Sequence, residues 1–185
     1  MSALHALVPV HVPVPELVRR SDVGALAWAG MCRDGTVAVL WGDVAVAAGL
    51  DVSPTMRLAA VADVVPARGV VGRASAAWVH LGGPAPSRVD VLVPPRGRRT
   101  DPDPWRASAE APLPAEDVLT LGRSRVTTVQ RTGLDVARWL PAPVAAVLLE
   151  GLCRVGFDPA AARARLEEAA GGRGLRQARE LLGRL

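Results

Sequence analysis

One short segment, VTTVQRTGLDVARWL, gathers hydroxyl groups and charges at close spacing. The residues concerned are Thr127, Thr128, Arg131, Asp135 and Arg138. Hydroxyl, carboxylate and guanidinium groups are components of nucleophilic and acid–base sites. The segment is therefore the first place to look for chemistry, and the alternative is an amphipathic helix with a charged outer face.

The helical interpretation accounts for every polar residue of this segment. Thr127 or Thr128 can cap the first turn, and Arg131 and Asp135 are i,i+4 neighbours, a pair worth about 0.3 kcal/mol when exposed. Apolar residues at helical spacing supply a buried face. These are Val129, Leu134, Ala137 and Leu140. We therefore interpret the segment as the junction between a region of strands and a helical end, without a catalytic role.

The basic residues exclude several enzyme mechanisms, because all 22 are arginine and none is lysine. No P-loop lysine can reach a phosphate, and no Schiff base can form. Asp90 lies in an alternating strand-like segment, as catalytic aspartates of nucleases and nucleotidyltransferases do. The nuclease pattern needs a following Glu-x-Lys, and the transferase pattern needs Gly-Ser with paired aspartates, so neither is complete. Asp90 is interpreted as a structural residue at a strand edge.

Cysteine and histidine spacing gives no sign of a metal site or a cofactor. Cys32 and Cys153 are far apart in the sequence, and the three histidines form no ligand pattern. The N-terminus lacks the basic region of a secretory signal, and no run of 18 apolar residues occurs. We expect a cytoplasmic protein that is not an enzyme, binds no cofactor or metal, and does not associate with membranes.

The net charge of +4 is unevenly distributed along the chain. Residues 1–122 contain 11 arginines and 12 acidic residues, whereas residues 123–185 contain 11 arginines and 6 acidic residues. A basic final third suits an acidic partner, either protein or nucleic acid. The candidate DNA- or partner-binding residues are Arg88, Arg96, Arg98, Arg99, Trp105, Arg173, Arg176 and Arg179. The alternatives are a solvated loop and the outer face of an amphipathic helix.

Hydropathy and turn residues predict strands in the middle of the chain and helices at its end. The expected helices before the opening segment are 16–31, a helix capped by Ser53, and one within 70–81; the expected strands are 37–40, 44–47, 87–93 and two around Gly122. Three helices follow to the C-terminus: one with apolar residues Val144, Val147, Leu148, Leu152 and Val155, one capped by Asp158, and a last one with Leu175, Ala178, Leu182 and Leu185. This order predicts an α+β fold and not alternating βαβ units.

Several segments together resemble the AbiEi-type antitoxins of type IV toxin–antitoxin systems, in their actinobacterial branch. They are VVGRASAAWVHLGG, RVDVLVPPRGRR, LPAEDVLTLGRSRVTTVQRTGLDVARWL and GGRGLRQARELLGRL. The strongest match is VTTVQRTGLDVAR, which is similar to the Thr-Thr-x-x-Arg-Thr-Ala-Leu-Asp-Leu-Ala-Arg signature of that group. The resemblance covers about residues 35–185.

The resemblance implies a winged-helix N-terminal part that binds operator DNA, and an α+β domain that counteracts a nucleotidyltransferase-like toxin. The wing would be the hairpin GTVAVLWGDVAVA, whose one charge is Asp43, and the part before it is short. We expect a reduced winged-helix region over residues 1–52 and an AbiEi-like α+β domain with a helical C-terminal part over residues 53–185. A nuclease-like domain, present in some relatives, is not expected.

Two functions remain open, with a third at low weight. The first is a non-enzymatic antitoxin or transcriptional regulator that binds protein, DNA or both. The second is a partner-binding or remnant domain without DNA contact. The third is a nuclease or nucleotidyltransferase relative, which the absence of lysine and of paired carboxylates disfavours.

Overall fold

The computed structural model describes residues 16–95, 101–168 and 171–185 of the chain. It divides into two compact units, residues 1–50 and 51–185, and each unit is described by itself. The smaller unit contains an antiparallel sheet and two short helices, and the larger contains a mixed sheet and a helical C-terminal part. The predicted α+β class is confirmed.

The N-terminal unit is a strand, two helices and a hairpin. Its elements are β1 (Val18–Arg19), α1 (Arg20–Val23), α2 (Ala25–Arg33), β2 (Val37–Trp41) and β3 (Val44–Ala47). Both strand pairs are antiparallel, and the order β1-β3-β2 puts the first strand beside the last. The hairpin turns at Gly42, whose φ of 52° suits a residue without a side chain. The predicted hairpin is therefore confirmed.

The prediction of a single helix over residues 16–31 is wrong, because a strand and two helices occupy this range. Val18 and Arg19 pair with β3, and Gly24, at φ 81°, separates α1 from α2. Three partly buried residues of α2 pack on the sheet, whereas Leu26 on the same helix is 92% exposed. The packed residues are Trp28, Met31 and Cys32. This helix thus has an apolar residue on its outer face.

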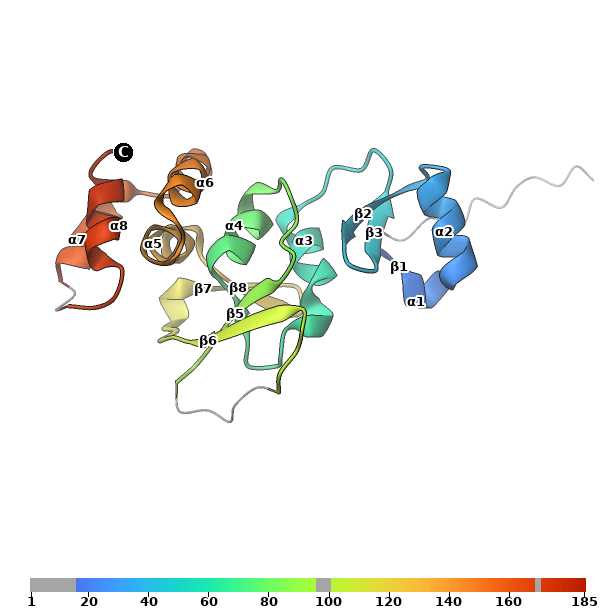
Figure 1. The fold of residues 1–185 in the computed structure, drawn as a ribbon, viewed down its shortest axis with the longest axis horizontal. Coiled ribbons are helices and arrows are strands. Elements are labelled where there is room, and N and C mark those ends of the chain that lie inside the picture. The colour runs from blue at the N-terminus through green and yellow to red at the C-terminus, as the bar shows by residue number, and fades with distance from the viewer. Residues whose placement is uncertain (1–15, 96–100, 169–170) are drawn as a thin grey trace, which may run out of the picture. The chain divides into compact units, whose positions relative to one another are not determined.

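A five-stranded mixed sheet forms the centre of the C-terminal unit (Figure 1). Its strands are β4 (Val70–Val71), β5 (Val89–Val93), β6 (Arg106–Glu110), β7 (Val118–Leu121) and β8 (Ser124–Thr127). The order is β6-β5-β4-β8-β7, with β5–β6 and β4–β8 parallel and the other neighbours antiparallel. Strand β5 and the pair around Gly122 were predicted from the sequence.

Two strands of this sheet escaped the sequence analysis. The two valines of β4 were assigned to the start of the following helix, but they are fully buried between β5 and β8. Strand β6 has the sequence RASAE, which contains no β-branched or aromatic residue. It pairs with β5 alone, so its formation depends on the neighbouring strand more than on its own propensity.

The helices of this unit differ in whether a side chain caps their first turn. They are α3 (Pro54–Ala60), α4 (Arg73–Leu81), α5 (Val129–Trp139), α6 (Ala142–Arg154), α7 (Pro159–Glu167) and α8 (Leu175–Leu182), with 3-10 turns η1 (Ala62–Val64) and η2 (Ala115–Asp117). The side chains of Ser53, Thr128 and Asp158 accept hydrogen bonds from backbone N–H groups in the first turn. These three predicted caps are confirmed.

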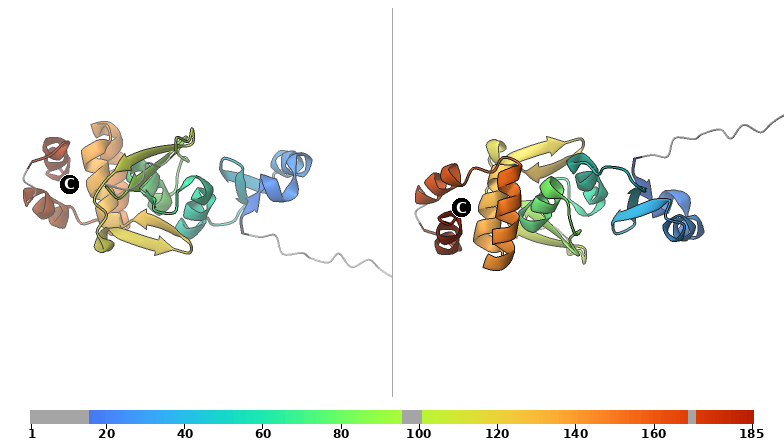
Figure 2. Two further views of the ribbon diagram at one scale, coloured as in Figure 1. Left: turned by 90° about the horizontal axis from the view of Figure 1, so that it is seen from below. Right: turned by 90° about the horizontal axis from the view of Figure 1, so that it is seen from above.

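Helix α5 is the centre of the helical part of the C-terminal unit. It contacts α4, which packs on the sheet, and it also contacts α6, α7 and α8. Figure 2 shows α7 and α8 farther from the sheet than α5 is. Leu134 and Ala137 of α5 join a core cluster that includes Leu149 of α6, Leu166 of α7 and Leu182 of α8. The predicted burial of Leu134 is confirmed, since the residue is 5% exposed.

The buried face of α6 agrees with the predicted one only in part. Leu152 is fully buried as predicted, but Val144, Val147 and Val155 are 49%, 69% and 46% exposed, and Leu149, which was not predicted, is fully buried. The helix is apolar on more than one side, so the sequence pattern does not indicate which side faces the core. On α8 the prediction holds for its first three apolar residues, but Leu185 is 50% exposed beyond the end of the helix.

Candidate binding site around Trp139

A buried carboxylate holds three elements together beside α5. Asp117, at the end of η2, accepts hydrogen bonds from Arg165 of α7 at 2.6 and 2.7 Å. It also accepts one from Arg131 of α5 at 2.7 Å, and Arg131 donates to Asp135 at 2.9 Å. The Arg131 side chain is only 12% exposed, so the expected solvated Arg131–Asp135 pair is instead part of a buried network.

The two carboxylates of this network have opposite pKa shifts. Burial alone would raise the pKa of Asp117, but the hydrogen bonds from Arg165 and Arg131 outweigh it and lower that pKa. Burial raises the pKa of Asp135, and the charge and hydrogen bond of Arg131 do not fully offset it. For Asp117 the arginines therefore stabilise the charged carboxylate more than burial destabilises it, whereas for Asp135 burial has the larger effect.

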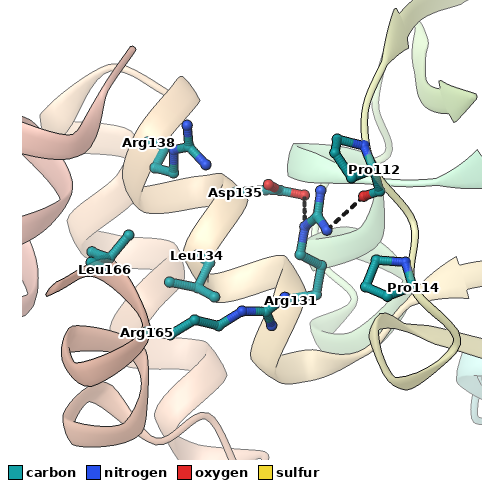
Figure 3. Close-up of a pocket in the computed structure, with 8 residues that line it drawn as sticks. All are labelled: Pro112, Pro114, Arg131, Leu134, Asp135, Arg138, Arg165 and Leu166. Carbon is teal, nitrogen blue, oxygen red and sulfur yellow. Dashed lines mark hydrogen bonds and ion pairs between the residues drawn. The ribbon is translucent and has the colours of Figure 1, made fainter. Parts of the chain in front are cut away.

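A pocket of about 240 Å³ opens beside this network (Figure 3). Its polar lining comes from Arg131, Asp135, Arg138 and Arg165, and its apolar lining from Pro112, Pro114, Leu134 and Leu166. Arg131 also donates to the carbonyl of Pro112 at 3.0 Å, which fixes the proline-containing segment as one wall. The pocket therefore combines guanidinium groups with apolar surface.

Three guanidinium groups surround the indole of Trp139, at the end of α5. Arg73, Arg138 and Arg173 lie 5.1, 5.3 and 5.8 Å from the ring centroid, within the range of cation–π attraction. Arg138 also lines the pocket, so it connects the two features. Trp139 itself is 37% exposed. We name Arg73, Arg138, Trp139 and Arg173 the Trp139 surface.

A close backbone approach brings Arg173 to this surface. Gly174 has a φ of 79°, and a Cβ at this position would lie 2.2 Å from the carbonyl oxygen of Arg138. Arg138 in turn donates to the carbonyl of Arg173, with Nη2 at 3.1 Å. Only glycine allows both the backbone conformation and the contact, so residue 174 ties the start of α8 to the end of α5.

The backbone of Arg73, which belongs to this surface, has a strained conformation. It is the first residue of α4, and it has a φ of 49°, a region that residues with side chains seldom occupy. Its Nε is buried and has no hydrogen-bond partner among the described residues. Strained backbone and unsatisfied donors tend to gather at functional sites.

Of the residues predicted from the sequence, Arg173 belongs to the Trp139 surface. Arg179 instead donates to the carbonyl of Leu166 at 2.9 Å, which joins α8 to α7, and Arg176 is exposed on α8. Arg88 donates to the carbonyl of Arg106 at 2.6 Å. Trp105 is 57% exposed just before β6. Arg96, Arg98 and Arg99 lie outside the described residues.

Asp90 does not lie at a strand edge, because β5 is flanked by β4 and β6. Burial raises the pKa of its carboxyl group, while Arg73 and the backbone N–H groups of Ser75 and Ala74 act in the opposite direction. Those N–H groups belong to the first turn of α4. The Asp90 carboxyl group, on the neighbouring strand β5, therefore accepts hydrogen bonds at the N-terminus of this helix and stabilises it. These hydrogen bonds support the interpretation of Asp90 as a structural residue.

Within the described residues, no group of three or more histidine, cysteine or acidic residues could hold a metal ion. His80 is engaged elsewhere: its Nε2 lies 2.8 Å from the carbonyl oxygen of Thr127, and burial lowers its pKa. Cys32 and Cys153 are partly buried and form no disulfide. No helix in the described part combines the length and apolar character needed to cross a membrane.

Sequence reasoning missed most of this site. Arg131 and Arg138 were noticed but assigned to a solvated face, and Arg73, Asp117 and Arg165 were not singled out. The adjacent Arg138 and Trp139 were a usable signal, because arginine and tryptophan are enriched in binding surfaces. The contributions of Arg73 and Arg165 come from distant helices, and only the fold brings them together.

The fold and the site define an α+β protein with an arginine-rich, tryptophan-containing surface. No protein-family model matches the chain, and no curated protein matches it. Among solved structures, it is similar to the crystal structure of the RV2827C protein from Mycobacterium tuberculosis, with 17% identity and a TM-score of 0.37. The similarity covers 91% of this chain and 76% of that one. A likeness this distant carries no argument about function.

Proposed function

We propose that this chain is a non-enzymatic regulatory protein, an antitoxin-like or transcriptional-regulator-like relative of the AbiEi group, which acts by binding. The observation that carries the proposal is the Trp139 surface, where distant helices bring arginines together around one indole. Arginine and tryptophan bind acidic partners with little loss of conformational freedom when they are already held in place. The partners proposed are operator DNA and a nucleotidyltransferase-like toxin.

The N-terminal unit supports a regulatory role through its order of elements. A strand, two helices and a hairpin with a three-stranded sheet is the arrangement expected of a reduced winged helix. In such units the second helix enters the major groove of DNA. Here that helix would be α2.

A second function, binding of a protein partner without DNA, is favoured by the charges of this same unit. Residues 16–50 contain three arginines and four acidic residues. Arg20 lies 3.5 Å from Asp43, and Arg33 lies 3.1 Å from Asp34, so each of these arginines is paired with an acidic residue of the same unit. Phosphate contacts require cations, whereas the exposed Leu26 suits a protein contact.

Fluorescence anisotropy with the full chain and a labelled duplex from upstream of its own gene distinguishes these functions. A regulator binds this duplex more tightly than a scrambled one, and its affinity falls steeply with added salt. Replacing Arg96, Arg98 and Arg99 by alanine then tests whether these three residues contribute. Equal, weak binding of both duplexes would remove the DNA-binding function and leave the protein-binding one.

The antitoxin function has its own experiment. The chain is co-expressed with the product of the adjacent gene, where that gene encodes a nucleotidyltransferase-like protein, and cell growth is recorded. An antitoxin restores growth, and the Arg173→Gln variant shows whether the Trp139 surface takes part. Unrelieved toxicity with the wild-type chain would contradict this function.

A further inference from the structure

The Trp139 surface carries three guanidinium groups whose charge nearby carboxylates offset only in part: Asp90 acts electrostatically on Arg73, and Asp135 acts on Arg73 and Arg138. Asp117 and Asp135 are engaged with Arg131 and Arg165. Within the described residues, Arg73, Arg138 and Arg173 form no ion pair with a carboxylate. These three guanidinium groups therefore remain available to a negatively charged ligand.

The positions of these groups are fixed before any ligand arrives. Each lies against the indole of Trp139, and Arg138 is also hydrogen-bonded to the backbone of Arg173. The backbone at Gly174 packs closely against the carbonyl group of Arg138. Side chains that are already ordered lose less conformational entropy on binding, so the arrangement is suited to recognition.

Arg73 provides a second observation at this surface, independent of the cation–π contacts. Its left-handed backbone and its buried, unpartnered Nε both cost free energy in the protein alone. A carboxylate or phosphate oxygen close to this guanidinium would satisfy part of its donor capacity.

The neighbouring pocket decides between the classes of acidic partner. Its volume of about 240 Å³ lies below the range of roughly 300–1,000 Å³ that is usual for small-molecule sites. Pro112, Pro114, Leu134 and Leu166 give it apolar walls beside its arginines, and a phosphodiester backbone, which is polar along its length, would leave these walls without a matching group. A single side chain of a protein fits such a space as an anchor, with acidic neighbours on the rim.

We propose that the Trp139 surface and this pocket form a docking site for an acidic segment of a partner protein. One apolar or acidic side chain of that segment enters the pocket beside Arg138, and flanking carboxylates pair with Arg73 and Arg173. The proposal rests on the proposed binding function and specifies the partner as a protein. It does not depend on whether the N-terminal unit binds DNA.

The probe for this site is a fluorescein-labelled synthetic peptide of alternating glutamate and leucine residues, titrated with the full chain. A peptide with lysine in place of glutamate controls for apolar binding, and a DNA duplex of equal net charge controls for charge alone. The variants are Arg138→Gln and Arg173→Gln. Arg184→Gln is the matched control, because Arg184 is 69% exposed and paired with Glu180 of α8.

The wild-type chain is expected to bind the glutamate peptide in preference to both controls. Arg138→Gln and Arg173→Gln each weaken this binding about tenfold, and Arg184→Gln leaves it unchanged. Arg173 is exposed, so its variant is expected to keep the wild-type melting temperature, which separates lost binding from lost folding.

Three results would overturn the docking site. They are absence of peptide binding by the wild-type chain, equal binding by all variants, and preference for the duplex with loss of duplex binding in Arg138→Gln. The last would assign the surface to nucleic acid. Upstream-DNA binding or toxin neutralisation that persists when the peptide fails would remove this site while leaving the proposed function standing.

Discussion

Replacing Asp117 by asparagine tests whether one buried carboxylate joins η2, α5 and α7. The substitution keeps the size of the side chain but removes its charge and one acceptor oxygen. Asp117 is 2% exposed, and three hydrogen bonds from guanidinium nitrogens at 2.6 to 2.7 Å end on it. In the variant, Arg131 keeps Asp135 as a partner, whereas Arg165 loses its carboxylate.

The expected cost follows from the burial of each partner. Removing one member of a fully buried ion pair destabilises a protein by about 3–5 kcal/mol. Arg165 is 43% exposed and recovers part of its solvation from water, which reduces the cost. Because Arg131 is nearly buried but retains Asp135, we expect Asp117→Asn to lower the free energy of unfolding by about 2–3 kcal/mol. This corresponds to a melting temperature roughly 6–15 °C lower for a unit of this size.

Asp135→Asn is the matched control, since it neutralises a second buried carboxylate on the same arginine. The pKa of Asp135 is raised in the folded protein, so its charged form already costs free energy at neutral pH. Neutralising it is expected to cost less than neutralising Asp117. Thermal and urea unfolding of both variants at pH 7, followed by far-ultraviolet circular dichroism, compares them.

Measuring stability as a function of pH distinguishes the two carboxylates, because their pKa values are shifted in opposite directions. The folded pKa of Asp117 is lowered, so its stabilisation is present above the unfolded value of about 3.9 and is lost as the pH falls through the folded pKa. The gap between wild type and Asp117→Asn therefore closes in acid. For Asp135 the pKa is raised, and wild type gains stability relative to Asp135→Asn as the pH falls. Equal losses for the two variants, with a gap independent of pH, would refute this account of the network.

Four further substitutions test the packing of the helical part. Leu134→Asp is expected to unfold the C-terminal unit, because it buries an unpaired charge in the core, and a wild-type melting curve would overturn this placement of α5. Leu149→Ala is expected to cost about 2–5 kcal/mol in urea unfolding, and Val147→Ala, at a 69% exposed position, less than 0.5 kcal/mol; equal costs would mean that the other face of α6 is buried. Gly174→Ala is expected to destabilise the end of the chain, because its Cβ would meet the Arg138 carbonyl, and unchanged hydrogen exchange in α8 would contradict that contact.

Local signals in the sequence predicted the parts of the fold that depend on neighbouring residues. Ser53, Thr128 and Asp158 cap helices as expected, because a cap requires only a side-chain oxygen and the next few N–H groups. The hairpin at Gly42 forms for a similarly local reason. Strand β6 was missed because alanine, serine and charged residues have little strand propensity of their own, and its formation depends on pairing with β5.

The candidate site shows where such reasoning stops. The sequence identified Arg131 and Asp135 as an i,i+4 pair on one helix, and that pairing is present at 2.9 Å. The burial of this pair depends on Asp117, which lies 14 residues from Arg131 in the sequence, and on Arg165, which lies 48 residues from Asp117. The free energy of the pair depends on the solvent around it, and no spacing along one helix determines that.

The sequence by itself determined the α+β fold class, the helix starts at Ser53, Thr128 and Asp158, the hairpin at Gly42, and the concentration of arginine in the final third. These follow from backbone propensities and composition, which act over a few residues. The tertiary structure alone decided which arginines gather around Trp139, because the three come from the start of α4, the end of α5 and the segment before α8. It also decided which face of α6 is buried, since an apolar helix can pack on either side until its neighbours occupy one of them.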